Sequence, residues 1–146
     1  MFIQLLIGSV IVSLAIATTG IFIGVAVRIL ERIGPWLAVP PHAVKTSVAL
    51  ICVSLWLLAA ITVVAWVWAA AFMGLDLFQE LEAALYFSTV TLTTLGFGDI
   101  ILPPGWRLLS GICAANGLLL FGLCAAFLFE LFVRLSEAQS QNRTKK

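Results

Sequence analysis

One short segment of this chain has the residues to coordinate a cation through its backbone. Residues 93–99 read Thr-Thr-Leu-Gly-Phe-Gly-Asp, so that glycines stand at alternate positions, Gly96 and Gly98. Glycine adopts backbone conformations that other residues avoid, which lets consecutive carbonyl groups point the same way. Rings of such carbonyls can replace the hydration shell of an ion. The sequence therefore predicts an ion-coordinating loop here.

The predicted ligands of this loop are main-chain oxygens together with one hydroxyl. The oxygen rings would come from the Thr94 hydroxyl and from the backbone of Thr94, Leu95, Gly96, Phe97 and Gly98. Potassium is the ion that stacked carbonyl rings accommodate after it loses its water. We expect the side chains of Leu95 and Phe97 to point away from the ion and to pack against the preceding helix.

That preceding helix is predicted over residues 78–92. The stretch after Glu82 is apolar and aromatic, but it is too short to cross a bilayer. A short apolar helix followed by glycines indicates a re-entrant segment, because irregular backbone survives at membrane depth only where it lines a cavity. Asp76 with Gln79 forms a weak capping pattern, and Glu80 and Glu82 would favour the helix N-terminus.

Gaps between charged residues locate the helices that must hold this loop. The chain is 62% hydrophobic and 10% charged, a composition typical of membrane proteins. Asp, Glu, Lys and Arg are absent before Arg28, between Lys45 and Asp76, and between Arg107 and Glu130. Each gap exceeds the roughly 20 residues that cross a bilayer core. We predict an all-α membrane protein with transmembrane helices at about 3–27, 47–73 and 107–133.

The first of these helices could be mistaken for a signal peptide. It has no positively charged residue at its start, and its apolar stretch is longer than the typical signal core of about 7–15 residues. We therefore expect an uncleaved helix. Basic residues lie after the first and third helices, at Arg28, Arg32, Lys45 and Arg134, whereas the loop after the second helix is acidic. The positive-inside rule then predicts a cytoplasmic C-terminus and an outward N-terminus.

Several function classes are disfavoured by the composition. The net charge of +1 gives no basic field for nucleic acid. The cysteines, Cys52, Cys113 and Cys124, lie in apolar runs without metal-ligand spacing, so we interpret them as small buried side chains. The helices carry no paired acids, Ser/His/Asp set or metal cluster, so we expect neither an enzyme nor a cofactor.

The segment 86–99, Tyr-Phe-Ser-Thr-Val-Thr-Leu-Thr-Thr-Leu-Gly-Phe-Gly-Asp, resembles the pore helix and selectivity filter of the potassium channel superfamily. Similar residues continue through Pro103, Trp106-Arg107, Asn116-Gly117 and Phe121-Gly122, so the resemblance covers about residues 47–133. We call residues 93–99 the filter segment. The resemblance implies that the residues supporting the filter are Thr93, Asp99, Tyr86, Phe87 and Val90.

This sequence departs from the family pattern behind the filter. Leu95 and Phe97 replace the more common Val and Tyr, which leaves the degree of potassium selectivity open. Val90 stands where some relatives carry an acid that pairs with the filter aspartate. Asp99 must therefore find another partner, and the candidates are water and Arg107.

The third span carries the candidates for gating. Gly117 and Gly122 could be hinges, because interior glycine weakens a helix, or they could allow close packing of helices. Asn116 could line the pore cavity or bond to a neighbouring helix. Phe121 could face the inner pore, although core packing is equally compatible with its spacing.

The expected organisation is an extra N-terminal helix (1–34), a cytoplasmic linker (35–46), a pore module (47–134) and a cytoplasmic tail (135–146). Within the pore module we expect an outer helix at 47–73, the pore helix at 78–92, the filter at 93–99 and an inner helix at 106–134. One filter per chain implies a homotetramer in a cell membrane, with the lipid bilayer and K⁺ as its other partners. The alternatives are a non-selective cation channel and an accessory or assembly subunit.

Overall fold

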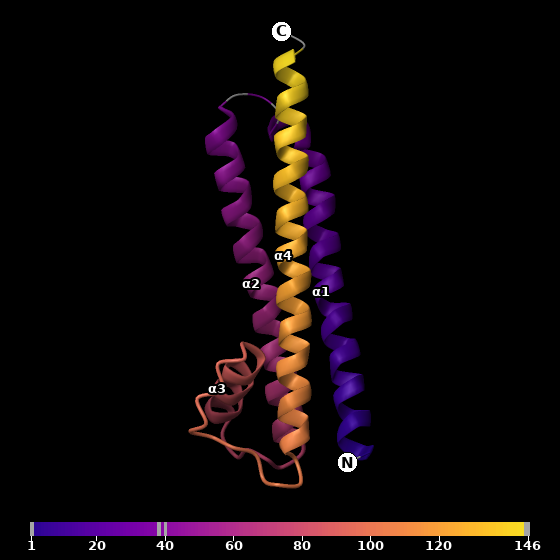
Figure 1. The fold of residues 1–146 in the computed structure, drawn as a ribbon, viewed down its shortest axis with the longest axis vertical. Coiled ribbons are helices and arrows are strands. Elements are labelled where there is room, and N and C mark those ends of the chain that lie inside the picture. The colour runs from indigo at the N-terminus through magenta and orange to yellow at the C-terminus, as the bar shows by residue number, and fades with distance from the viewer. Residues whose placement is uncertain (1, 38, 40, 145–146) are drawn as a thin grey trace.

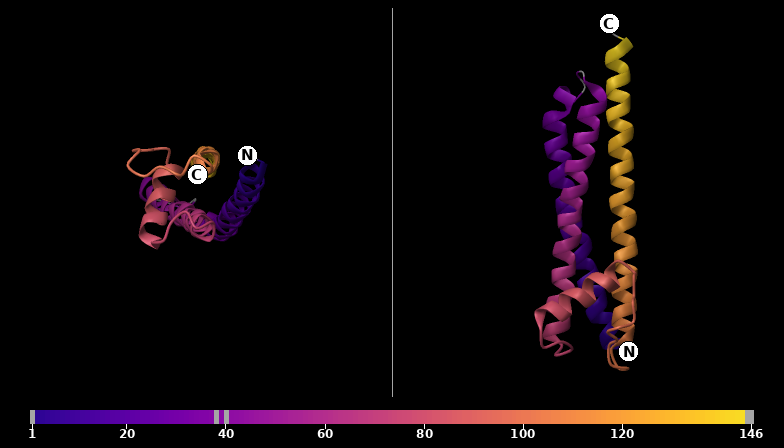
Figure 2. Two further views of the ribbon diagram at one scale, coloured as in Figure 1. Left: turned by 90° about the horizontal axis from the view of Figure 1, so that it is seen from below. Right: turned by 90° about the vertical axis from the view of Figure 1, so that its left-hand side faces the viewer.

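The computed structural model describes residues 2–37, 39 and 41–144, and these residues form four helices and no strand. Three long helices, α1 (Phe2–Leu37), α2 (His42–Gly74) and α4 (Arg107–Thr144), run side by side (Figure 1). The short helix α3 (Leu81–Leu92) lies across one end of this bundle (Figure 2). The chain begins at the end that carries α3 and finishes at the opposite end.

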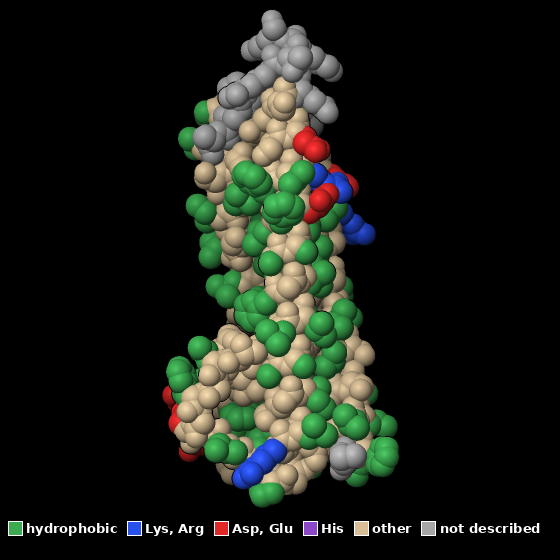
Figure 3. All heavy atoms as spheres, in the orientation of Figure 1, with side chains coloured by type: hydrophobic (Ala, Val, Ile, Leu, Met, Phe, Trp, Pro, Cys, Tyr) green, Lys and Arg blue, Asp and Glu red, His purple; other side chains and the backbone are tan. Residues whose placement is uncertain are grey.

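The three long helices are long and apolar enough to cross a membrane. The candidate spans are Phe2–Gly34, Val44–Gly74 and Arg107–Glu137. Hydrophobic side chains cover the visible face of the bundle along its length, and charged side chains gather toward its ends (Figure 3). Such a surface suits lipid rather than water. The prediction of an all-α membrane protein with three spans and one short apolar helix is confirmed.

The helices extend beyond the membrane-spanning lengths expected from the charge gaps. α1 and α2 together occupy most of the expected linker at 35–46, and α4 continues through the expected tail to Thr144. Charge gaps mark the apolar core, whereas Glu, Gln, Lys and Arg are good helix formers that prolong a helix in water. The side chain of Gln139 donates a hydrogen bond to Oγ1 of Thr46 at 2.9 Å, which joins this extension of α4 to α2.

The start of α3 differs from the expected capping pattern. Asp76 has a φ of 55°, and its N–H donates to the carbonyl of Met73 at 2.9 Å, so Asp76 belongs to the end of α2. The N-cap of α3 is Glu80, with an extended φ of −112° and no side-chain capping bond. Glu82 lies in the first turn, where the helix dipole favours an acid. The prediction that Asp76 and Gln79 cap α3 was wrong, because Asp76 belongs to the turn that ends α2 and the N-cap of α3 is Glu80.

Aromatic packing attaches α3 to α2. The ring centroid of Phe87 lies 5.2 Å from that of Phe72 and 5.3 Å from that of Phe78, and Trp68 packs against Phe72 at 5.6 Å. Tilted and edge-on pairs at these separations add about 0.5–1.5 kcal/mol each beyond area burial. Leu92, at the other end of α3, belongs to the same core cluster. These contacts fix the helix that precedes the filter segment.

Candidate functional site

The backbone of the filter segment alternates in handedness. The φ angle is positive at Thr94 (61°), Gly96 (53°) and Gly98 (78°), whereas the intervening Leu95 and Phe97 lie outside that region. In an ordinary strand, successive residues face opposite sides. Left-handed residues at every second position reverse this alternation and turn successive carbonyls toward one side. A row of carbonyls on one side is the arrangement that can replace ion hydration.

Thr94 adopts its positive φ without the freedom of glycine. Residues held in such regions typically cost about 1–3 kcal/mol and persist only where their surroundings fix them. Here the Thr94 N–H donates to the carbonyl of Thr91 at 2.9 Å. At Gly96 and Gly98, a Cβ would meet no atom within 4 Å, so the backbone conformation rather than lack of space explains the glycines.

The C-terminal turn of α3 holds the start of the filter segment through main-chain bonds. The carbonyl of Val90 accepts the N–H of Leu95 at 3.0 Å and the N–H of Gly96 at 3.3 Å. The Thr93 hydroxyl donates to the carbonyl of Thr89 at 2.8 Å and to that of Val90 at 3.2 Å. Val90 therefore contacts the filter segment through its backbone, a role that its side-chain type did not indicate.

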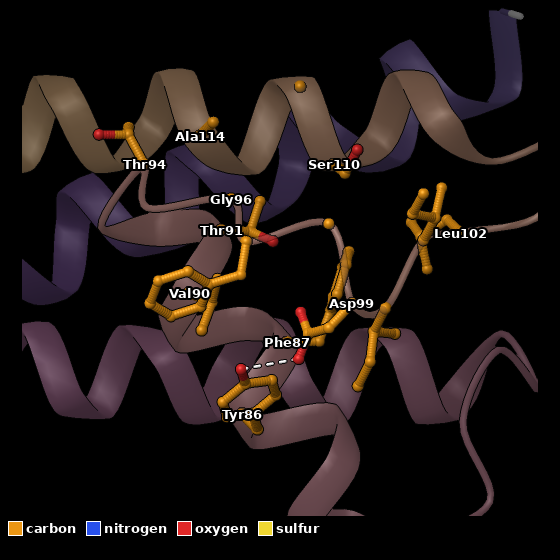
Figure 4. A pocket seen from close by; sticks show the side chains of 15 residues that line it. Tyr86, Phe87, Val90, Thr91, Thr94, Gly96, Asp99, Leu102, Ser110 and Ala114 are labelled. Atoms are coloured by element: carbon orange, nitrogen blue, oxygen red, sulfur yellow. Dashed lines mark hydrogen bonds between the residues drawn. The ribbon is translucent and has the colours of Figure 1, made fainter.

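The other end of the filter segment is tied to α3 by a side-chain bond. The phenol of Tyr86 donates to Oδ2 of Asp99 at 2.8 Å (Figure 4). This hydrogen bond, together with desolvation and the Asp99 charge, raises the pKa of Tyr86 above its ordinary value of 10.0. The suggested pairing of Asp99 with Arg107 was wrong, since Nε of Arg107 donates to the carbonyl of Leu102 at 3.3 Å.

The apolar side chains of the filter segment lie on the surface of the single chain. Leu95 is 61% exposed and Phe97 is 67% exposed, so neither is buried against α3. Phe87, an expected filter support, is 5% exposed and packs into the core with Phe72 instead. Within one chain, the filter segment is held by the hydrogen bond from Tyr86 to Asp99 and by the main-chain bonds to the carbonyl of Val90.

A hollow of about 300 Å³ lies between α3, the filter segment and the first turns of α4. Tyr86, Val90 and Thr91 line it from α3, and Ser110 and Ala114 line it from α4 (Figure 4). Residues 96–102, together with Thr94, form the remaining wall. The filter segment therefore stands away from α4, attached mainly through its two ends.

Gly117 marks the closest approach between α4 and α3. A Cβ on Gly117 would lie 1.7 Å from the carbonyl oxygen of Leu92, a separation that no packing adjustment of side chains could relieve. Gly117 is thus a contact position between α4 and α3, and its role as a hinge stays a prediction. Leu92 was not predicted as a site residue, because a leucine whose main-chain carbonyl contacts a neighbouring helix leaves no mark in the sequence.

The remaining candidates on α4 lie in different environments. Asn116 is fully buried, and its amide nitrogen and oxygen have no hydrogen-bond partner among the described residues. It therefore faces the core of this chain. A Cβ on Gly122 would meet nothing within 4 Å, and Phe121 is 39% exposed. The open face of α4 includes these last two positions.

Comparison with known proteins gives an independent view of the same region. Residues 51–134 match a family described as an ion channel. The voltage-gated potassium channel regulatory subunit KCNG3 from Mus musculus, Rattus norvegicus and Homo sapiens is 36% identical to this chain over 69 residues. That match covers 42% of this chain and 16% of each relative, so the chain spans a small part of their length. No solved structure matches the chain.

Proposed function

The chain belongs to the ion channel family that matches residues 51–134, and we propose that it is the pore-forming subunit of a homotetrameric, potassium-selective channel. The matched part is a pore module of the potassium channel superfamily, and it includes α3, the filter segment and most of α2 and α4. The family and the relatives are ion channels rather than enzymes. Selectivity and assembly are the parts of this proposal that go beyond family membership.

The alternating backbone of the filter segment carries the proposal. Positive φ at Thr94, Gly96 and Gly98 supports a row of carbonyls on one side of the chain. In the proposed pore, these oxygens bind dehydrated K⁺ at successive levels. The level nearest α3 also uses the Thr94 hydroxyl. The ligating residues are Thr94, Leu95, Gly96, Phe97 and Gly98.

Four copies are required because one row of oxygens covers only one side of an ion. Closed cyclic symmetry places equivalent rows around an axis. The exposure of Leu95 and Phe97, at 61% and 67%, supports this arrangement, since large apolar side chains beside a filter need a cover. In the proposed tetramer, the neighbouring chain provides that cover.

The domain arrangement follows from the same proposal. Residues 47–134 form the pore module, with α2 as outer helix, α3 as pore helix and α4 as inner helix. Thr93, Tyr86 and Asp99 support the filter through the hydrogen bonds described above. α1 is an additional helix in front of this module.

The proposed orientation places the filter end outside the cell. Arg28, Arg32, Lys45 and Arg134 lie toward the opposite end of the three long helices, which the positive-inside rule assigns to the cytoplasm. The N-terminus then faces outward and the C-terminus inward, in a multi-pass protein of the cell membrane.

Flux into liposomes tests the proposal directly. The purified chain should admit K⁺ far faster than Na⁺, and barium should block the K⁺ flux. Equal flux of the two ions would contradict the proposed K⁺ selectivity and would favour a non-selective channel. That alternative rests on Leu95 and Phe97, which replace the more common Val and Tyr of the family. Gly24→Ala is a suitable control variant, because a Cβ there meets no atom within 4 Å.

A second candidate is a regulatory subunit that works only beside other chains. The names of the matching relatives favour it, because each is called a regulatory subunit. This candidate predicts that the purified chain forms no four-fold assembly in detergent and passes no ion in liposomes. Mass measurement of the detergent-solubilised protein separates the two proposals, since a pore-forming homotetramer must contain four copies.

A further inference from the structure

α1 lies outside the matched pore module and yet is bonded to the loop that follows the filter segment. The side-chain amide Nε2 of Gln4 donates a hydrogen bond to the carbonyl of Gly105, 101 residues away in the chain. Gln4 is only 8% exposed, and most of its neighbours in α1 are apolar. A buried polar side chain in an apolar span is costly unless it is bonded, so such residues usually mark functional contacts.

One turn beyond Gln4, α1 comes into close contact with α4. A Cβ on Gly8 would lie 2.8 Å from Cδ1 and 2.9 Å from Cγ2 of Ile112. Small residues allow helices in membranes to approach closely in this way. At Gly20, Gly24 and Gly34, farther along α1, a Cβ would meet nothing within 4 Å. The close approach is therefore confined to the end of α1 that lies at the same end of the bundle as the filter segment (Figure 1).

The apolar side chains of α1 continue this contact into the buried core that also contains residues of the loop after the filter segment and of α4. Ile11 and Ala15 belong to the same buried cluster as Leu102, Leu109 and Cys113. Leu102 follows the filter segment closely, and its carbonyl accepts Nε of Arg107 at 3.3 Å. The first turns of α1 thus contact both the loop after the filter and the first turns of α4.

The loop at residues 100–106 is the covalent connection between the outer end of the filter and α4. Its filter end is held by the bond from Tyr86 to Asp99, and its α4 end is held by the bond from Gln4 to Gly105. The filter segment itself borders a hollow of about 300 Å³, so α4 does not support it directly along its length. The loop is therefore held from two sides, by α4 through the bond from Arg107 to the carbonyl of Leu102 and by α1 through the bond from Gln4 to Gly105.

We propose that Gln4 and Gly8 are positioning residues for the ion-coordinating backbone, and that α1 fixes the outer end of the filter through the Gly105 carbonyl. The effect on ion selection rests on the proposed channel function. Gln4 binds no ion, and acts by holding the loop at a fixed distance from α3. Displacement of that loop changes the spacing of the carbonyls, on which discrimination between K⁺ and Na⁺ depends.

Two variants and their controls test this role in the full-length chain. Gln4→Met keeps the length of the side chain and removes one hydrogen bond, since Oε1 of Gln4 has no partner among the described residues. Gly8→Leu forces α1 away from Ile112, whereas Gly20→Leu adds the same side chain where a Cβ meets nothing. The double variant Gly8→Leu/Ile112→Ala returns space at the contact.

The first measurement is the ratio of K⁺ to Na⁺ permeability in liposomes. We expect Gln4→Met to lower the ratio about fivefold, the change that corresponds to one hydrogen bond. Gly8→Leu should lower it at least as much, the double variant should recover most of the loss, and Gly20→Leu should match the unmodified protein. An unchanged ratio in Gln4→Met and Gly8→Leu would overturn the proposal, as would an equal loss in Gly20→Leu.

Hydrogen exchange supplies a measurement that does not depend on permeation. The loop has backbone N–H groups at Ile100, Ile101, Leu102, Gly105 and Trp106, since Pro103 and Pro104 have none. These amides should exchange faster in Gln4→Met than in the unmodified protein, while those of α2 stay the same. If the unmodified chain passes Na⁺ as readily as K⁺, the proposed selectivity fails, and the exchange result alone decides the positioning role. Equal exchange of residues 100–106 in the two proteins would overturn that role.

Discussion

The phenol of Tyr86 and the carboxylate of Asp99 are joined by a hydrogen bond of 2.8 Å that closes the filter segment onto the helix before it. The bond spans 13 residues, and the whole filter segment lies between its partners. Because the other end of the segment is bonded to Val90, both ends are fixed to α3. α3 therefore restrains the carbonyl row at both ends, and α1 restrains the loop that follows it through the carbonyl of Gly105.

Removal of the Tyr86 hydroxyl should weaken this closure. We expect Tyr86→Phe to keep the fold, because the ring remains, and to reduce the stabilisation that K⁺ gives to the assembly. The measurement is the difference in Tm between KCl and NaCl, since an ion that binds only the folded filter raises Tm by mass action. Thr18→Val is the control, as its hydroxyl bonds only within α1, to the carbonyl of Leu14. Equal K⁺ stabilisation in Tyr86→Phe and the unmodified protein would refute the role of the bond.

The same bond predicts the pH dependence of the filter. The hydrogen bond to Asp99 raises the pKa of Tyr86 above 10.0, so the neutral phenol is favoured in the folded protein. Its contribution is fully present below the unfolded pKa and is lost as pH rises through the higher folded value. K⁺ stabilisation should thus be constant from about pH 7 to 9 and fall above about 10. In Tyr86→Phe this alkaline fall should disappear.

Gly117 and Gly122 should respond differently to the same substitution. Gly117→Ala drives a Cβ into the carbonyl of Leu92, so we expect a loss of roughly 1–3 kcal/mol or more and a lowered Tm. Gly122→Ala meets no atom and should be neutral or gain up to about 1 kcal/mol from helix propensity. Electrical recording then tests the hinge hypothesis, because a hinge at Gly122 would require Gly122→Ala to change opening without changing stability.

Substitution of Gly96 tests the filter itself. Gly96→Ala places a side chain at a φ of 53°, which costs an L-residue roughly 1–2 kcal/mol in each chain. We expect K⁺-selective flux to disappear while Gly24→Ala retains it. The oligomeric state must be measured in parallel, because in the proposed homotetramer the filter is shared by four chains and helps to hold them together. Selective flux through an intact Gly96→Ala assembly would place the ion-coordinating segment elsewhere.

The sequence predicted features that depend on local patterns. The spans follow from gaps between charged residues, and the filter segment follows from alternate glycines after a short apolar helix. Contacts between distant segments left no such pattern: Leu92 meets Gly117, and Gln4 meets Gly105, only after the helices pack. For the second contact the sequence offered one signal, since Gln4 is a polar residue among the apolar residues at the start of α1.

The environment of Asn116 is another feature that the sequence could not predict. Its position within an apolar helix allowed either a wet cavity or a bond to a neighbour. The structure buries it completely, on the face of α4 that also carries Cys113 and Leu120. Which face of a helix is covered depends on its neighbours, so an apolar helix with weak periodicity leaves the choice open.

The uninterrupted length of α4 has a mechanical consequence. α4 runs from Arg107 to Thr144, and its backbone touches α3 at Gly117. At about 1.5 Å per residue, the arm beyond this fulcrum is roughly 40 Å long and the arm toward the filter is roughly 15 Å long. A tilt of α4 about Gly117 therefore moves its far end nearly three times as far as its filter end. In the proposed channel, such a tilt would convert a large displacement of the C-terminal end of α4 into a displacement about one third as large beside the filter segment.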